Sequence, residues 1–237
     1  MRLKAAIVVF PGSNCDRDCA RAWEFVTGGK ASFVWHKESS MEDCDVVILP
    51  GGFSFGDYLR SGAIARFSPV MAEVARLAKR GSLVLGICNG FQILTEAGLL
   101  PGSLIRNSGL KYVCKDVFVR VENVSSPFTG RYEEGQVLRI PISHGEGNYN
   151  APGDVLERLR DEGRVVLRYS DPSGRVGPDT APNGSADSIA GVLGEGGNVL
   201  GIMPHPERVS DRQLGGTDGA AFWESMVDSL RVKGIRV

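Results

Sequence analysis

Short apolar runs rich in β-branched residues alternate along this chain with longer amphipathic stretches. The first apolar run, 5–10, reads as a strand, and a predicted helix follows over 16–27 and ends at two glycines. Strand and helix in alternation are typical of βαβ units, whose strands pack side by side in one sheet. The alternation therefore predicts an α/β fold with an open, mostly parallel sheet and helices on both faces.

The other expected elements continue the same pattern. Further strands are expected at 31–35, 45–49, 82–87, 117–121, 137–140, 165–169, 189–193 and 199–202. Further helices are expected at 61–79, from Cys88 to about residue 97, at 155–160 and at 217–232. The stretch 170–185 is rich in Gly, Pro, Asp and Ser and is typical of a surface loop. We expect residues 1–237 to form a single domain.

Charge and cysteine content narrow the possible functions. The chain has 27 Lys+Arg against 28 Asp+Glu, so its composition carries no electrostatic signature of nucleic-acid or membrane binding. Five cysteines are an odd number without a dense framework, which disfavours a disulfide-stapled secreted protein. The apolar run at 5–10 is too short for a signal peptide or a membrane span. We expect a cytoplasmic protein without nucleic-acid or membrane partners.

The segment 83–94 carries the most specific chemical signal. An apolar strand ends there in a Gly-x-Cys-x-Gly turn around Cys88, and a helix begins directly after it. In a nucleophile elbow, small residues such as Gly86 and Gly90 relieve the crowding of a strained turn. The start of the helix favours a thiolate at Cys88, and the backbone N–H of Asn89 offers one hydrogen bond to an oxyanion. A buried structural cysteine is the alternative, but it would not need this turn.

A nucleophilic cysteine needs a base, and His205 is the best candidate among the three histidines. It follows the predicted strand 199–202, near the sheet edge where other strand ends meet. In extended backbone, residues i and i+2 point to one side, so the carboxylate of Glu207 could hold the imidazole tautomer. Taken alone, this segment could be a proline-rich surface turn, so the interpretation depends on its pairing with Cys88.

A second oxyanion donor is expected just after the strand 45–49. Two glycines there allow the backbone N–H of Gly52 or Phe53 to face a ligand. A phosphate-binding loop is excluded because the segment has no lysine, whereas an ordinary tight turn stays possible. Cys15 and Cys19 share one helix face but lack a nearby His or third Cys, so we expect no metal site and leave their roles open.

Together these motifs resemble the class I, or triad, glutamine amidotransferase family. The resemblance rests on five blocks: FPGSNCD at 10–16, PGGFSFGD at 50–57, GICNGFQ at 86–92, PISHGEG at 141–147 and MPHPER at 203–208. The elbow and the His-x-Glu pair are shared across the wider superfamily. The first two blocks resemble more specifically the glutaminase subunits of phosphoribosylformylglycinamidine synthase. The blocks span nearly the whole chain.

The resemblance implies a flavodoxin-like fold and hydrolysis of L-glutamine to glutamate and ammonia. Cys88 would attack the amide carbon, His205 would protonate the departing ammonia, and Glu207 would orient His205. The ammonia would pass to a large synthetase subunit, which aminates formylglycinamide ribonucleotide with ATP in purine biosynthesis, and a small subunit would bridge the two. No cofactor is implied in this chain, since ATP and Mg²⁺ would bind the synthetase subunit.

The resemblance also suggests contacts to bound glutamine from Gln92, Ser143, His144 and Gly145. One departure from the family is the stretch 174–182, which is longer than the usual turn. Two other functions stay open at this point. The chain could be a stand-alone γ-glutamyl or other cysteine hydrolase that uses the same elbow, or it could be a catalytically idle binding subunit.

Overall fold

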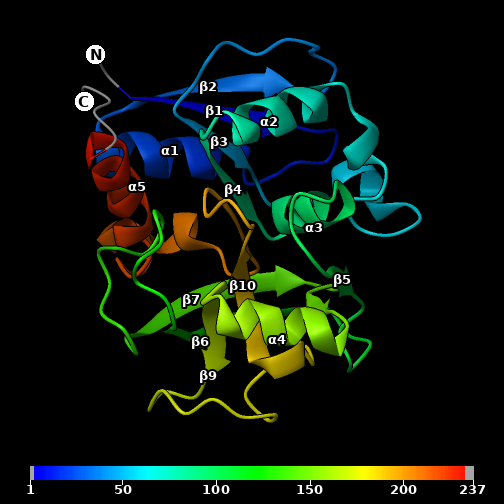
Figure 1. Cartoon of the computed structure of the whole chain (residues 1–237), viewed down its shortest axis with the longest axis vertical. Coiled ribbons are helices and arrows are strands. Elements are labelled where there is room, and N and C mark those ends of the chain that lie inside the picture. The colour runs from blue at the N-terminus through cyan, green and yellow to red at the C-terminus, as the bar shows by residue number, and fades with distance from the viewer. Residues whose placement is uncertain (1–2, 233–237) are drawn as a thin grey trace.

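The computed structural model describes residues 3–232 and is built around one nine-stranded sheet (Figure 1). Its strand order is β2-β1-β3-β4-β11-β10-β9-β6-β7. The bounds are β1 (Lys4–Val9), β2 (Lys30–Trp35), β3 (Val46–Leu49), β4 (Leu83–Ile87), β6 (Val113–Val121), β7 (Val137–His144), β9 (Val165–Ser170), β10 (Ile189–Leu193) and β11 (Val199–Ile202). A separate antiparallel pair joins β5 (Ser103–Ile105) to β8 (Asn148–Asn150).

The expected open α/β sheet is confirmed, and it is mixed. Strands β2, β1, β3, β4 and β11 pair in parallel, whereas β10, β9, β6 and β7 add antiparallel pairs at one side. The central strands β3 and β4 are buried along their whole length, which explains why both read as continuous apolar runs. The carboxyl ends of β3, β4 and β11 lie together at one edge, and each leads directly into a predicted site segment.

The described residues form five α-helices: α1 (Asp16–Thr27), α2 (Val70–Lys79), α3 (Asn89–Glu96), α4 (Gly153–Asp161) and α5 (Ala220–Val232). The chain moves outward from β1 to β2 and then inward to β3 and β4, so right-handed crossovers place α1 and α2 on opposite faces. Helix α1 packs against α5, and the two lie side by side in Figure 1. Helix α3 packs on β3, β4 and β11, and therefore begins at the edge where those strands end.

The expected helix over 61–79 is wrong in its first half. Only Val70–Lys79 is α-helical, and the preceding residues form a short 3-10 turn at Ala65–Phe67. Ser68 is extended, with ψ 139°, as a residue before a proline usually is. Phe67, which fits the apolar spacing of a helix, is exposed.

The second half of the chain also departs in detail from the sequence expectations. Strands β6 and β7 are both longer than expected and form an antiparallel pair, so that β7 delivers His144 to the site edge. The short strands β5 and β8 were not expected at all. The stretch 174–182 is fastened by Arg175, which donates hydrogen bonds to Asp171 and Asp179. No helix within residues 3–232 is long and apolar enough to cross a membrane.

Candidate functional site

Cys88 sits at a strained turn between β4 and α3. Its backbone has φ 50° and ψ −105°, a conformation that non-glycine residues rarely adopt. The two flanking glycines have no room for a side chain: a Cβ on Gly90 would lie 1.9 Å from the Leu49 carbonyl oxygen, and one on Gly86 would lie 2.5 Å from Leu94 Cδ1. The elbow expected from the Gly-x-Cys-x-Gly spacing is therefore present, and both glycines are required by it.

The elbow presents the Cys88 thiol to a cavity of about 250 Å³. The thiol itself is largely buried and lies 3.6 Å from the Ser143 carbonyl oxygen. The Cys88 backbone N–H donates to the Ile202 carbonyl at 2.7 Å, which ties the elbow to the end of β11. The same strand leads within three residues to His205, so the sheet register brings the two segments together.

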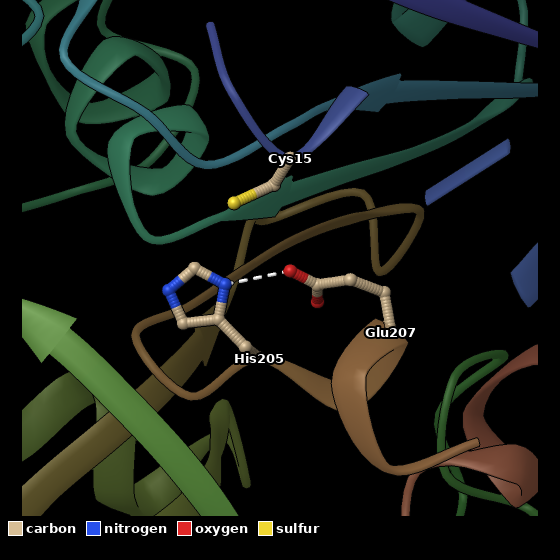
Figure 2. Close-up of side chains that lie close together, drawn as sticks. All are labelled: Cys15, His205 and Glu207. Atoms are coloured by element: carbon tan, nitrogen blue, oxygen red, sulfur yellow. Dashed lines mark hydrogen bonds and ion pairs between the residues drawn. The ribbon is translucent and has the colours of Figure 1, made fainter. Parts of the chain in front are cut away.

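His205 and Glu207 form a buried pair directly after β11. Nδ1 of His205 lies 2.6 Å from Oε1 of Glu207, and neither side chain is exposed by more than 3 % (Figure 2). The His205 backbone N–H donates to the Pro141 carbonyl, which fixes the segment against β7. A carboxylate acceptor at Nδ1 keeps the proton there in the neutral imidazole, so Nε2 is the nitrogen left for chemistry.

The surroundings of His205 raise its pKa well above the usual value. Burial is the largest single influence and lowers this pKa, but the charge of Glu207 and the interactions with Cys88 and Cys15 together outweigh it. Nε2 has no hydrogen-bond partner among residues 3–232. The site is therefore built to hold a protonated imidazole beside Cys88.

Cys15 is a second thiol beside the same imidazole, a position that no sequence pattern predicts. Its sulfur, a His205 ring nitrogen and a Glu207 carboxylate oxygen all lie within 4.8 Å of one another, and Figure 2 shows the sulfur pointing towards the ring. The expectation that Cys15 has no histidine nearby is thus wrong, because β11 brings His205 to the start of α1 from the far end of the chain.

Those three ligand types could in principle hold a metal ion. Two contacts argue for a different role here. Arg208 Nη2 lies 3.2 Å from the Cys15 sulfur, and this cation would repel a metal. Glu207 already binds Nδ1 of His205. Cys15 also contacts Asn14 Oδ1 at 3.1 Å, so its sulfur is part of a hydrogen-bond network behind the imidazole.

The two thiols differ in their access to the cavity. Cys88 lines it, whereas Cys15 is absent from its lining. Cys15 also lacks the strained backbone of Cys88, since its φ is −107°. Of the two, Cys88 has the position that a nucleophile needs.

Of the two candidate oxyanion donors expected in the segment after β3, only one has its N–H free of a backbone partner within the described part of the chain. The Phe53 N–H already donates to the Gly12 carbonyl at 2.9 Å. Gly52 faces the cavity with φ 149°, and a Cβ there would lie 2.6 Å from the Gly12 oxygen. Asn89 begins α3, and its side chain accepts a hydrogen bond from the Ser54 N–H, which fastens this segment to the elbow. Gly52 and Asn89 are thus the better pair of backbone donors, and Phe53 is the weaker choice.

The four expected glutamine contacts all line the cavity: Gln92, Ser143, His144 and Gly145. Gln92 donates through Nε2 to the Glu146 carbonyl at 2.6 Å, so it holds the 143–147 loop in place. Burial, aided by the charge on His205, lowers the pKa of His144 to about 4, so its ring is neutral. Whether any of the four touches glutamine stays a prediction.

The other lining residues are Glu146, which lies in the 143–147 loop already expected at the site, and six residues that were not among the expected contacts: Asp57, Ser61, Arg106, Leu110, Lys111 and Tyr112. Asp57 and Glu146 lie inside two of the blocks that carry the family resemblance, and their acidic character was the available signal. The others lie in no motif. They lie near the 3-10 turns after β3 and in the loop between β5 and β6, which the spacing of apolar residues does not predict.

Comparison with known proteins first defines the class. The family of CobB/CobQ-like glutamine amidotransferase domains matches residues 2–220. A glutaminase domain of Trypanosoma brucei CTPS shares the fold, with a TM-score of 0.59 over 97% of this chain and 94% of that chain, at 15% identity. The chain is therefore a glutamine amidotransferase domain of this type.

Closer relatives define the family within that class. The phosphoribosylformylglycinamidine synthase subunit PurQ of Salinibacter ruber is 55% identical over 98% of this chain and 99% of the relative. That of Koribacter versatilis is 52% identical over 96% and 99%. A chain of the PurLQS structure from Thermotoga maritima has a TM-score of 0.86 and 46% identity over 97% of this chain and all of that one. The chain belongs to the family of phosphoribosylformylglycinamidine synthase PurQ subunits.

Proposed function

We propose that this chain hydrolyses L-glutamine to glutamate and ammonia, and that Cys88, His205 and Glu207 carry out the reaction. The single observation that supports it most is the elbow thiol lining a cavity beside a buried imidazole that is hydrogen-bonded to a carboxylate. This arrangement provides a nucleophile and, beside it, a proton carrier that is hydrogen-bonded to an orienting group.

In the first half of the reaction, the Cys88 thiolate attacks the side-chain amide carbon of glutamine. The carbonyl oxygen becomes an oxyanion, which the backbone N–H groups of Gly52 and Asn89 stabilise by about 3–4 kcal/mol per donor. His205 donates its Nε2 proton to the amide nitrogen, the C–N bond breaks, and ammonia leaves. The products are a glutamyl thioester and a neutral imidazole.

In the second half, water replaces ammonia. His205 takes a proton from the water at Nε2 while the oxygen attacks the thioester carbon. The C–S bond breaks, glutamate is released, and the thiolate and the imidazolium are restored. Glu207 stabilises the positive charge that His205 carries at the start and at the end of the cycle.

The ammonia is used by a partner. Like the relative found in the PurLQS structure, this chain would assemble with a large synthetase subunit and a small subunit, and deliver ammonia for the ATP-dependent conversion of formylglycinamide ribonucleotide. Ammonia in neutral water is mostly ammonium, which is no nucleophile, so a passage closed to water preserves it. ATP and Mg²⁺ would bind the synthetase, and this chain would need no cofactor. We also propose that the chain forms a single domain and acts in the cytoplasm.

The test compares two cysteine variants in the complex assembled with the synthetase and small subunits. Cys88→Ala is expected to abolish ammonia release from glutamine, and to abolish labelling by a chloroketone analogue of glutamine. Cys114→Ala is the matched control, because that thiol is exposed on β6 and should leave both readouts unchanged. Ammonia release by Cys88→Ala would refute the proposed nucleophile.

The same assays address the other two functions. A stand-alone hydrolase would turn over γ-glutamyl peptides without partners, whereas we expect the isolated chain to do so poorly. An idle binding subunit would leave Cys88 unlabelled in the assembled complex. Mass spectrometry of the labelled peptide separates Cys88 from Cys15.

A further inference from the structure

The cavity beside Cys88 is lined by side chains of both charges. Asp57 and Glu146 supply two carboxylates to its lining, and Arg106 and Lys111 supply two cations. Arg106 is 79% exposed, so the positive charge lies at the mouth. L-Glutamine is a zwitterion at its α-carbon, with an ammonium and a carboxylate that need partners of opposite sign. A cavity with both signs fits such a group better than it fits a neutral amide.

The carboxylates of Glu146 and Asp57 differ in whether their oxygen atoms already have polar partners. Oε2 of Glu146 accepts the Ser61 backbone N–H at 3.0 Å, and its Oε1 lies 3.8 Å from Nε of Arg106. Oδ1 of Asp57, by contrast, is buried and has no hydrogen-bond partner among residues 3–232. A buried carboxylate oxygen without a partner is unfavourable, and a ligand that donates a hydrogen bond to it removes the penalty.

The backbone around Asp57 is strained in a way that fixes its side chain. Phe55, Gly56 and Asp57 all have positive φ, at 53°, 69° and 55°. Two of them are not glycine, and each such residue costs about 1–3 kcal/mol, which the surrounding structure must offset. The Phe55 N–H donates to the Pro11 carbonyl at 2.7 Å, which holds the turn. Strain of this kind collects where a side chain must point in one direction.

Negative charge on Asp57 is disfavoured, because neither Arg106 nor Lys111 offsets its burial. Burial, together with the neighbouring Glu146, raises the pKa of Asp57 to about 6, and a contact with Ser61 only partly opposes this. An ammonium group would reverse the effect, because it would stabilise the ionised carboxylate. The ionised form of Asp57 is therefore unfavourable in the site without substrate, and a bound ammonium group would stabilise it.

We propose that Asp57 is the specificity-determining residue that recognises the α-ammonium of glutamine, with Glu146 beside it. The inference rests on the proposed glutaminase function and adds a requirement for the free amino group. Arg106 and Lys111 at the mouth would attract the α-carboxylate. The side-chain amide then extends towards Cys88, so that Asp57 fixes the substrate at the end remote from the reacting carbon.

The test pairs two substrates with two variants in the assembled complex. The second substrate is 4-carbamoylbutanoate, which has the amide and the carboxylate of glutamine but no amino group. Asp57→Asn is expected to lower kcat/KM for glutamine by about 10- to 100-fold, mainly through KM, since one charge-assisted hydrogen bond is lost. It should leave kcat/KM for 4-carbamoylbutanoate within about twofold. Asp43→Asn, on a surface carboxylate, should change neither.

The outcomes separate this inference from the proposed function. A complex that releases no ammonia from glutamine refutes both. If the wild-type complex releases ammonia from glutamine, the result with Asp57→Asn decides. Equal losses of kcat/KM for glutamine and 4-carbamoylbutanoate, or no loss for either, would refute only the role of Asp57.

A measurement on the wild-type complex avoids any folding defect of the variant. L-Glutamate and glutarate should both inhibit glutamine hydrolysis competitively, but glutamate should bind about 10-fold or more tightly, because only glutamate carries the ammonium. Equal inhibition by the two would overturn the proposal.

Discussion

Gly90 lies so close to Leu49 that a methyl group on its α-carbon would come within 1.9 Å of the Leu49 carbonyl oxygen. This contact joins the first turn of α3 to the last residue of β3. Both partners are buried, and the oxygen belongs to the backbone of a central strand, so neither can move aside cheaply. The position of the elbow is therefore fixed by the absence of a side chain at Gly90.

The substitution Gly90→Ala is expected to lower the free energy of unfolding by about 2–4 kcal/mol, because the helix must shift away from β3. Ammonia release should fall with it, since the shift moves Cys88. Gly153→Ala is the matched control: nothing lies within 4 Å of its Cβ position, and it should change stability by less than about 1 kcal/mol. Urea unfolding of the isolated chain measures both. Equal stability of the two variants would contradict the close approach.

Glu207→Gln should lower kcat for glutamine hydrolysis by about 10²- to 10⁴-fold with little change in KM, because the amide cannot stabilise an imidazolium. The carboxylate also raises the pKa of His205 against the effect of burial. Its removal lowers that pKa, so activity that needs the protonated ring should disappear at lower pH than in the wild type. Ammonia release between pH 5 and 10 tests this, and Glu195→Gln on the surface is the control. An unchanged pH profile would count against the pair.

Local signals in the sequence were sufficient for the parallel part of the sheet. Helix α1 begins and ends where the spacing and its two terminal glycines predict, and β11 agrees residue for residue with the expected strand. The same holds for β10, the first antiparallel strand beside it. The expected helix over 61–79 is wrong before Val70 because Pro69 favours an extended Ser68, an effect that the apolar spacing does not reflect. Strands β5 and β8 have three residues each, which is too short for any periodic pattern.

The sequence identifies site residues only where they lie in a recognisable motif. The residues proposed as the triad follow strands β4 and β11, so one elbow and one His-x-Glu pair located them. Cys15 could not be placed there, because its approach to His205 depends on the packing of α1 against the segment after β11. The sequence does not indicate that Asp57 lines the cavity, because the direction of its side chain depends on three consecutive residues with positive φ.

Cys15 is expected to support His205 without acting as a nucleophile. Its sulfur contacts Arg208 Nη2 and Asn14 Oδ1, and a serine hydroxyl could make both contacts. Cys15→Ser should therefore retain most of the activity, whereas Cys15→Ala should lose about 2- to 10-fold in kcat, the equivalent of one or two modest hydrogen bonds. Labelling of Cys88 by the chloroketone should persist in both variants. Loss of labelling in Cys15→Ser would instead identify Cys15 as the reactive thiol.

Asp57 should weaken the fold at neutral pH, in keeping with a role in binding. Its pKa rises from 3.8 to about 6 on folding, so the protonated form is the one that the folded state prefers. The stability of the chain is then unaffected by this group below about pH 4 and decreases as the pH rises through 6. The full decrease corresponds to at most about 3 kcal/mol, and to less for a side chain that is partly exposed.

Asp57→Asn cannot ionise, so it should raise the free energy of unfolding by about 1–2 kcal/mol at pH 8 and by much less at pH 4. Urea unfolding of the isolated chain at both pH values measures the difference. Asp43→Asn, whose carboxyl is 66% exposed beside Arg80, should show no such gain at pH 8. A variant that loses glutamine recognition while gaining stability would tie the strained turn to substrate binding. An equal gain at pH 4 and pH 8 would show that the effect does not arise from the charge.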